Sequence, residues 1–475
     1  MCGIVGAYNA PNASEVLQLM LYYLQHRGQE SAGEVTTGDG AEGRFHEHQG
    51  DGLVNDIFTE EVLASLLGNR GIGHNRYPTQ EGSLIQPIGR EVGGEKWYVV
   101  HNGNLINDWS GFDFKIDTQL ILHNLCLTDS SLPVHERIYA ALENINGAFS
   151  LLILHQDKEG RDTLIAVRDP QGFRPLCMAQ YNGGYLFASE SCAFSAIESA
   201  IFSRHIQPGE ILCVNSEGLY SYKPEAWQGQ EKSRCIFELV YFCRPDSRVE
   251  TAESVREDVF LGQVQEEMGA QLARENPDFK ADVLLPVPQS ALRHGAGFAR
   301  ENGDILLDSG ITRSHYGGRR TFIDGGTDRL QKILKKFIFI IYIIFGKRIA
   351  LLSDSIVRSS TMMTMIKAMR QVVGKITSIT LLIASPPVKF PCFYGIFVPK
   401  RDELAFNKHG GADGTRDHVG ADDLRYLSKY GMCEAVCKKT GFKPSDYCTA
   451  CFTGNFPLCA KIDNPEYRKE AGLSD

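Results

Sequence analysis

The sequence predicts two domains of different class: an α+β domain built as a sandwich of β-sheets over residues 1–230, and an α/β domain with a parallel sheet over residues 231–475. Three observations predict this division. The 475 residues exceed what one core holds, because single cores stop growing beyond about 250–300 residues. Short β-like segments dominate the first half, whereas strands alternate with helical stretches in the second. A polar stretch at residues 216–233 lies between the two patterns.

The first half contains many expected strands and few long helices. One helix is predicted between Asn12, as its N-cap, and Gly28, as its stop signal, because apolar residues recur there at helical spacing. Strands are expected at residues 4–8, 97–101, 150–155, 163–168 and 185–188. Many short strands of this kind favour a sandwich of sheets.

The second half alternates short apolar runs with helical stretches. Strands are expected at residues 283–287, 349–352 and 379–383, and helices at 290–301 and 361–373. This alternation is typical of a parallel sheet flanked by helices. The most apolar run, residues 337–345, holds nine residues and is about half as long as a membrane-spanning helix requires. It is predicted to be a buried strand.

Composition and charge exclude several classes of protein. With 43% hydrophobic and 23% charged residues, the chain matches globular proteins rather than disordered or collagen-like ones. The 58 acidic and 49 basic residues give a net charge of −9, which argues against nucleic-acid binding. No secretory leader or membrane span is expected, so a cytoplasmic location is predicted. Thirteen cysteines are too sparse for a disulfide framework, and clustered cysteines are expected to bind metal or act as catalysts.

Cys2 directly follows the initiator methionine. If Met1 is removed, Cys2 carries both a thiol and a free α-amine, whose pKa of about 7.7–8 is close to the working pH. The amine can then act as the general base for the thiol of the same residue, directly or through a water molecule. The dipeptide alone is a weak signal for a nucleophile of this kind.

Four further motifs accompany Cys2 in a fixed order. They are HRGQESAG at 26–33, GHNRYPT at 73–79, HNGNL at 101–105 and VRDPQGFRPL at 167–176. Together with MCGIVG at the start, they resemble the class II glutamine amidotransferase domain of the N-terminal-nucleophile (Ntn) hydrolases, an αββα sandwich. The resemblance covers residues 1–230 and implies hydrolysis of glutamine with release of ammonia.

The resemblance implies roles for individual residues. Cys2 would be the nucleophile, while the Asn102 side-chain amide and the Gly103 backbone N–H would hold the oxyanion. Glutamine would be bound by Arg27, Arg76, Thr79 and Asp117. Of these, Arg76 would hold the α-carboxylate, because a planar guanidinium binds a carboxylate bidentately, and Asp117 would receive the α-ammonium group. His74 and His101 are given no role, since packed structural histidines would look the same.

Motifs in the second half resemble the iron–sulfur branch of the amidophosphoribosyltransferase family. They are YFCRPDS at 241–247, RSHY at 313–316, GKRIALLSDSIVRSST at 346–361 and ASPP at 384–387. The resemblance implies a type I phosphoribosyltransferase fold and an enzyme of purine biosynthesis. Such an enzyme channels ammonia from glutamine to phosphoribosyl pyrophosphate and forms 5-phosphoribosylamine. Purine nucleotides are then the expected inhibitors, and a homodimer or homotetramer is the expected assembly.

The motif at 346–361 predicts a strand, a turn and a helix that starts near Ser360. Backbone N–H groups at such a helix start bind phosphate, and acidic residues at the strand end would contact ribose hydroxyls and a metal. The expected phosphoribosyl pyrophosphate contacts are Asp354, Ser355, Ile356, Val357, Arg358, Ser359, Ser360 and Thr361. Mg²⁺, which takes oxygen ligands and bridges phosphates, is expected at Ser290, Ser353 and Asp354.

Three positions depart from the family pattern. Ser353 stands where the family has a second acid, Ser359 where it has glycine, and Gln289 where it has aspartate. Each lost contact would cost about 1–3 kcal/mol, so one alternative is a paralogue that keeps glutaminase activity but has impaired or lost transfer. Another alternative is a non-enzymatic regulatory or assembly subunit that binds nucleotides or an active homologue.

Four cysteines stand at the ligand positions of the iron–sulfur branch: Cys235, Cys392, Cys448 and Cys451. The resemblance implies a [4Fe–4S] cluster, for which four thiolates are the expected ligand count. Zinc in a Cys₄ site is the alternative, because thiolates alone do not choose the metal. The nearby Cys243, Cys433, Cys437 and Cys459 are expected to be buried or spare thiols.

Overall fold

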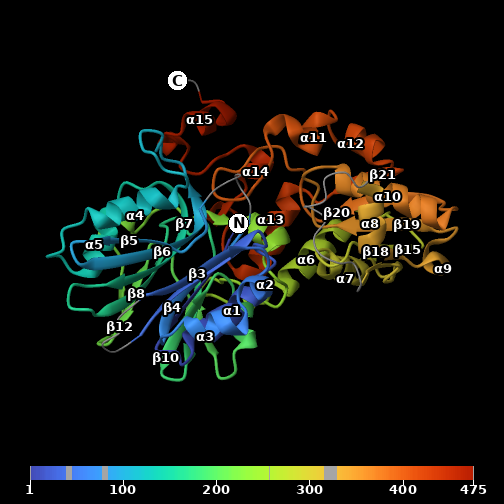
Figure 1. The fold of residues 1–475 in the computed structure, drawn as a ribbon. Coiled ribbons are helices and arrows are strands. Elements are labelled where there is room, and N and C mark those ends of the chain that lie inside the picture. Colours follow the sequence, from blue (N-terminus) through green and yellow to red (C-terminus); the bar gives the residue numbers. More distant parts are fainter. Residues whose placement is uncertain (1, 39–44, 78–83, 256, 315–328, 474–475) are drawn as a thin grey trace.

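The computed structural model describes residues 2–38, 45–77, 84–255, 257–314 and 329–473. It confirms the predicted fold class, with two antiparallel sheets in the first half and a parallel sheet in the second. The two halves form adjacent bodies, the first drawn in blue to green and the second in yellow to red (Figure 1). No helix within the described ranges is long and apolar enough to cross a membrane.

The first half is a sandwich of two sheets. One sheet has the order β11-β9-β10-β1-β4-β2-β3, and the other has the order β13-β12-β8-β7-β6-β5. The strands are β1 (Gly3–Tyr8), β2 (Ser31–Thr37), β3 (His46–Asp51), β4 (Arg70–Arg76), β5 (Ile88–Val92), β6 (Glu95–Leu105), β7 (Gly147–Gln156), β8 (Asp162–Arg168), β9 (Cys177–Tyr181), β10 (Gly184–Ala188), β11 (Ile201–His205), β12 (Ile211–Asn215) and β13 (Gly218–Tyr222). Apolar side chains of both sheets, such as Ile4, Ile72 and Leu152, meet in a shared core.

Helices cover the two outer faces of this sandwich. On the first sheet lie α1 (Ala13–Tyr23), α2 (Val54–Ile57) and α3 (Glu60–Ser65), and on the second lie α4 (Thr118–Cys126) and α5 (Val134–Leu142). The layers therefore run helix, sheet, sheet, helix. Helix α1 begins directly after Asn12, as predicted, although the Asn12 side chain makes no capping hydrogen bond.

The second half is built on a parallel sheet of order β16-β15-β19-β20-β21. Its strands are β15 (Val283–Pro286), β16 (Leu306–Leu307), β19 (Arg348–Ser353), β20 (Ser378–Ile383) and β21 (Asp423–Tyr426), and its larger helices are α6 (Leu261–Arg274), α7 (Leu292–Asn302), α10 (Ser360–Val373) and α13 (Lys429–Thr440). The inner strands are almost wholly buried, because a parallel sheet is covered by helices on both faces.

The apolar run at 337–345 is not the single buried strand that the sequence predicted. It divides into β18 (Phe337–Phe339), which pairs with β17 (Ile311–Arg313), and α9 (Ile341–Ile344). Phe337 and Phe339 are buried, but Ile338 is 50% exposed and Tyr342 is 83% exposed. The physical reason is topological: β15 pairs directly with β19, so the run has no place between these two strands, and its first three residues pair with β17 outside the five-stranded sheet.

The C-terminal segments return to the first half. They are β22 (Tyr447–Cys448), which pairs with β14 (Arg234–Cys235), and the helices α14 (Ala450–Thr453) and α15 (Pro465–Ala471). The helices α8 (Arg329–Lys336), α11 (Ala405–Lys408) and α12 (Ala412–Val419) pack within the second half. Helix α15 lies above the first half (Figure 1), where the Tyr467 hydroxyl accepts a hydrogen bond of 3.0 Å from Asn104 Nδ2. The ring of Tyr394 stacks on that of Phe173, with centroids 4.4 Å apart. The two halves thus share an apolar interface.

Candidate active sites and cysteine cluster

Strand β1 begins at the candidate nucleophile. The Cys2 N–H donates to Asn102 Oδ1 over 3.1 Å, and the Cys2 carbonyl accepts from Arg27 Nε over 2.9 Å. The next amide, that of Gly3, donates to Asn75 Oδ1 over 2.9 Å. The main chain is therefore fixed on both sides of the thiol by side chains from three different segments.

The Cys2 thiol lies beside a buried histidine. Burial raises the pKa of this thiol, but the neighbouring His74 imidazole outweighs it and the net pKa is lowered to about 6. A large share of the thiol is then ionised near neutral pH, and the thiolate is the reactive form. His74 lies in β4 and is completely buried. The sequence contained it in GHNRYPT but gave no sign that distinguished it from a packed histidine.

Asn102 and Gly103 lie near the end of β6. Asn102 Nδ2 is buried and has no hydrogen-bond partner within the described ranges. A buried donor of this kind costs about 1–3 kcal/mol of stability unless a ligand accepts its hydrogen bond. Gly103 is tightly enclosed: a Cβ atom there would stand 1.9 Å from the Ala148 carbonyl oxygen. Only glycine therefore allows the strand to pass at this point.

Two of the residues expected to bind glutamine lie close to this site's elements. Arg76 ends β4, is 8% exposed and has its Nε 3.6 Å from Glu30 Oε2. Asp117 precedes α4 and accepts the Leu105 N–H over 3.0 Å. Burial raises the pKa of Asp117, but the His101 imidazole at 3.7 Å outweighs it and the net pKa is lowered. Thr79 lies outside the described residues.

Arg27, also expected to bind glutamine, contacts the main chain of Cys2 and two carboxylates. Its five N–H donors all have partners: Nε donates to the Cys2 carbonyl, Nη1 to Glu190 Oε1 and Cys243 Sγ, and Nη2 to both carboxylate oxygens of Glu238. An arginine has five such donors in total, so none remains for a substrate carboxylate. Arg27 holds the main chain of Cys2 rather than offering a guanidinium to glutamine.

The transferase loop begins where β19 ends. As predicted, a turn follows and α10 starts at Ser360. Ser290 Oγ and Ser353 Oγ lie 3.5 and 3.4 Å from Asp354 Oδ1. Asp354 Oδ2 is buried without a partner in the described part of the chain, and burial raises the pKa of this carboxyl to about 7. The three residues expected to hold Mg²⁺ therefore lie together: the hydroxyl groups of Ser290 and Ser353 contact one oxygen of Asp354, and the other oxygen is unsatisfied.

A neighbouring segment holds the same loop. Ser359 Oγ lies 3.2 Å from His409 Nε2, and the His409 ring stacks on that of His418 with centroids 3.8 Å apart. Arg358 Nη2 donates to Glu403 over 3.1 Å. Sequence reasoning did not find these contacts, because about fifty residues separate the partners and no spacing rule connects them.

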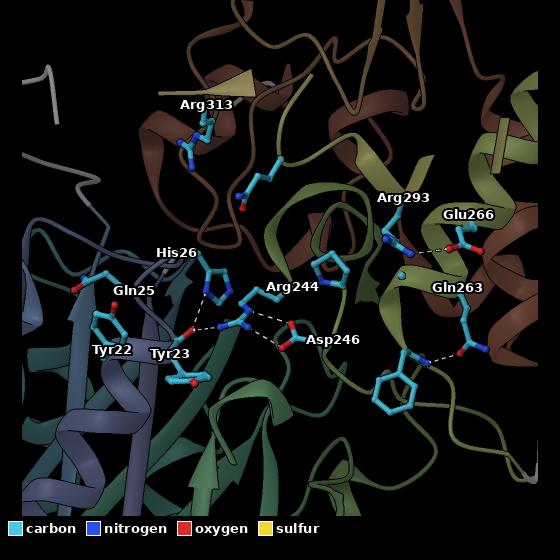
Figure 2. Close-up of a pocket in the computed structure, with 14 residues that line it drawn as sticks. Tyr22, Tyr23, Gln25, His26, Arg244, Asp246, Gln263, Glu266, Arg293 and Arg313 are labelled. Atoms are coloured by element: carbon cyan, nitrogen blue, oxygen red, sulfur yellow. Dashed lines mark hydrogen bonds and ion pairs between the residues drawn. The ribbon is translucent and has the colours of Figure 1, made fainter. Parts of the chain in front are cut away.

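A cavity of about 1100 Å³ lies between the two halves (Figure 2). Residues at the end of α1 form one wall, among them Tyr23 and His26, and residues of α6 and α7 form the other. Gln289, directly before Ser290, also lines it. Figure 2 shows Arg244 extending between these walls toward Asp246, which it contacts at 2.7 Å. The cavity is therefore lined by both halves, and Gln289 brings the segment before Ser290 to it.

The four candidate ligand cysteines converge from three segments. Cys235 and Cys448 are direct neighbours in the parallel pair β14 and β22. Cys451 lies in α14, and its carbonyl accepts the N–H groups of Lys389 and Phe390. Burial raises the pKa of Cys451, and the charges of the other three cysteines raise it further. Within the described residues, no group of three or more His, Cys, Asp or Glu side chains is arranged to hold a metal ion.

Comparisons with known proteins cover both halves. A family described as glutamine amidotransferase domain matches residues 76–196. The chain is 36% identical to "Amidophosphoribosyltransferase 2, chloroplastic" of Arabidopsis thaliana, over 96% of this chain and 79% of the relative. It is 31% identical to the amidophosphoribosyltransferase of Bacillus subtilis (strain 168), over 96% of this chain and 94% of the relative.

Solved structures give the same result. The structure of glutamine phosphoribosylpyrophosphate amidotransferase from B. subtilis complexed with ADP and GMP matches with a TM-score of 0.83 and 31% identity, over 96% of this chain and 97% of that one. A structure described as the allosteric regulatory enzyme of purine biosynthesis matches with a TM-score of 0.84, also at 31% identity and over 96% of both chains. Since the similarity extends over both halves, the chain belongs to the amidophosphoribosyltransferase family, the glutamine-dependent transferases of purine biosynthesis.

Proposed function

We propose that residues 1–230 form the glutaminase and residues 231–475 the phosphoribosyltransferase of a working amidophosphoribosyltransferase. The observation that carries this proposal is the arrangement at Cys2, whose pKa is lowered to about 6. The buried donor of Asn102 stands next to it, because the same side chain accepts the Cys2 N–H. A nucleophile and an oxyanion donor therefore share one site.

In the first reaction, the Cys2 sulfur attacks the side-chain carbonyl carbon of glutamine. The α-amine freed by removal of Met1 takes the thiol proton and passes it to the leaving nitrogen, so that ammonia departs and a thioester remains. Asn102 Nδ2 and the Gly103 N–H hold the oxyanion, and water then releases glutamate. Arg76, Thr79 and Asp117 hold the α-carboxylate and α-ammonium groups of the substrate.

In the second reaction, ammonia displaces pyrophosphate from the anomeric carbon of phosphoribosyl pyrophosphate. The loop from Asp354 to Thr361 binds this substrate, with the N–H groups at the start of α10 facing phosphate. The unsatisfied oxygen of Asp354, with the hydroxyl groups of Ser290 and Ser353, fits a hard cation. Mg²⁺ at this point would neutralise charge on the pyrophosphate as it leaves.

The departures at Ser353, Ser359 and Gln289 do not favour the paralogue without transfer activity. Ser353 still brings an oxygen to Asp354, and relatives named amidophosphoribosyltransferase match the chain over nearly its whole length. A transferase assay with ammonia in place of glutamine tests this loop independently of Cys2. Formation of no phosphoribosylamine under these conditions would exclude the proposal.

The four cysteines lie near one another, since Cys235, Cys392 and Cys448 all act electrostatically on the Cys451 thiol. Because four thiolates are the ligand count of a [4Fe–4S] cluster, we propose Cys235, Cys392, Cys448 and Cys451 as the ligands of such a cluster. Zinc in a Cys₄ site is the alternative, and a metal assay decides between the two. A colourless protein without iron after purification in the absence of oxygen would contradict this assignment.

Three further expectations remain predictions. The B. subtilis structure holds ADP and GMP, which supports inhibition of this chain by purine nucleotides. The homodimer or homotetramer is tested by light scattering. The cytoplasmic location is tested by cell fractionation, since relatives include both bacterial and chloroplastic proteins.

A further inference from the structure

Four buried charged side chains lie together at the interface between the two halves, and one of them, Arg27, contacts Cys2. Arg27 and Arg174 contribute from the first half, and both have no exposed surface. Glu190 lies in the first half too, whereas Glu238 comes from the second half and is 3% exposed. Two guanidinium groups and two carboxylates therefore balance one another away from water.

Glu238 is the acceptor that joins these groups. It opens the helical turn Glu238–Phe242, and its carboxylate accepts from Arg27 Nη2 at 3.0 and 3.2 Å and from Arg174 Nη1 at 3.2 Å. The Cys243 thiol donates to the same carboxylate over 3.3 Å. Arg174 in turn donates from Nε to the Tyr394 carbonyl over 2.9 Å.

This arrangement determines where the guanidinium of Arg27 lies. A guanidinium is planar and rigid, so fixing two of its nitrogens fixes the third. Glu190 and Glu238 hold Nη1 and Nη2, and Nε is thereby directed at the Cys2 carbonyl. Because Asn102 holds the amide of the same residue, the position of the Cys2 thiol depends on where Arg27 is held.

We propose that Glu238 is a positioning residue of the glutaminase, which acts through Arg27 to hold the main chain of Cys2 in place. The inference rests on the proposed role of Cys2 as the nucleophile. It gives a residue of the transferase half a direct part in the geometry of the other active site. The chain of hydrogen bonds from Glu238 continues through Arg174 to the Tyr394 carbonyl. The backbone N–H of Tyr394 donates to Cys392 Sγ over 3.4 Å.

The test compares Glu238→Gln with a matched control. Glu250 is also a second-half carboxylate that pairs with arginines, but its partners are Arg168 at 2.8 Å and Arg234 at 2.6 Å rather than Arg27. Glu238→Gln is expected to lower kcat for glutamine hydrolysis by about tenfold, since small displacements of a nucleophile are costly. The KM for glutamine should stay within about twofold, because Arg27 has no donor left for substrate. Glu250→Gln should leave both constants close to those of the wild type.

Alkylation of Cys2 gives a readout that a purely structural role would not change. The rate of iodoacetamide labelling is measured against pH, and the labelled peptide is identified by mass spectrometry. In Glu238→Gln, the pH at which the labelling rate reaches half of its maximum should rise by at least about half a pH unit, because the thiol loses its position beside His74. In Glu250→Gln it should not move.

Two further variants distinguish an error in the inference about Glu238 from an error in the proposed role of Cys2. Arg27→Lys keeps the charge but lacks the rigid planar fork that holds the Cys2 carbonyl, Glu190 and Glu238 in fixed positions, so it should lower kcat in the same way even if Glu238→Gln fails to fold. Cys2→Ala tests the proposed function alone: if glutamate release survives it, the role of Cys2 is wrong. If Cys2→Ala is inactive while Arg27→Lys or Glu238→Gln behaves like Glu250→Gln in kcat and in labelling, the inference about Glu238 is wrong.

Discussion

Among the described residues, the glutaminase half and the transferase half each have a buried side-chain atom without a hydrogen-bond partner at a residue expected to act on substrate or metal, and these two atoms are opposite in kind. In the first half it is a donor, Asn102 Nδ2, and in the second it is an acceptor, Asp354 Oδ2. The guanidinium of Arg27 beside Cys2 is paired with carboxylates, whereas the Asp354 carboxyl is contacted by hydroxyl and backbone N–H groups. The first site is thus prepared for an oxyanion, and the second for a cation.

The largest expected effect distinguishes the glutaminase activity of the first half from the transferase activity of the second. Cys2→Ala should reduce glutamine-dependent formation of phosphoribosylamine by at least about a thousandfold, because the nucleophile is lost. Ammonia-dependent formation should be unchanged, since ammonia enters after the first reaction. Loss of both activities would show that the halves are not separable in this way.

The second effect concerns the unpartnered acceptor. Asp354→Asn should reduce both glutamine-dependent and ammonia-dependent transfer by about a hundredfold or more, because the amide no longer attracts a cation. Thermal unfolding in metal-free buffer serves as the control. Its midpoint should not fall, since the replaced oxygen has no partner to lose; a lower midpoint would point to a structural role instead.

The third effect tests the cysteine cluster that lies between the halves. Cys451→Ser should remove bound iron and visible absorbance, because three thiolates do not complete the ligand set. Cys433→Ser is the control, since Cys433 is a buried thiol of α13 and stands outside the candidate ligand set. Equal iron contents in the two variants would show that Cys451 is not a ligand.

The fourth effect concerns pH and the first half alone. In the wild type, the alkylation rate of Cys2 should rise with pH and level off above its pKa of about 6. His74→Asn removes the imidazole that lowers this pKa while the burial that raises it remains, so the midpoint should move upward. Activity of this variant should therefore fall more at about pH 6 than at about pH 8, and an unchanged midpoint would rule out the contribution of His74.

The smallest effect concerns the serine that replaces glycine in the transferase loop. His409 holds the Ser359 hydroxyl, so we expect Ser359→Gly to change the KM for phosphoribosyl pyrophosphate by less than about threefold. The measurement is the ammonia-dependent transferase assay. A much larger gain in affinity would show that Ser359 obstructs the phosphate site.

The sequence predicted much of the fold because its signals are local. The alternation of short apolar runs with helices placed β15, β19 and β20 within one or two residues, and the strand, turn and helix around Asp354 followed from one motif. The prediction of a single buried strand at 337–345 was wrong, because the burial of this run depends on which strands pair with β15 and β19. Local composition does not contain that information.

The contacts around the candidate sites were harder to foresee. Arg27 and Glu238 are separated by 211 residues, and Ser359 and His409 by 50, so no spacing rule joins them. The roles of Asn102, Gly103, Arg76 and Asp117 came from family resemblance and remain predictions. Arg27 shows why structure is needed, because a motif identifies a residue without showing which acceptors its side chain contacts.

The strand that carries Asn102 and Gly103 receives its final support from the far end of the chain. Asn104 donates to the Phe393 carbonyl over 2.9 Å and to the Tyr467 hydroxyl over 3.0 Å. Phe393 and Tyr467 follow Asn104 by 289 and 363 residues. A chain that has been synthesised only as far as its first half therefore lacks both acceptors, and this end of the strand behind the candidate oxyanion donors is completed by the second half.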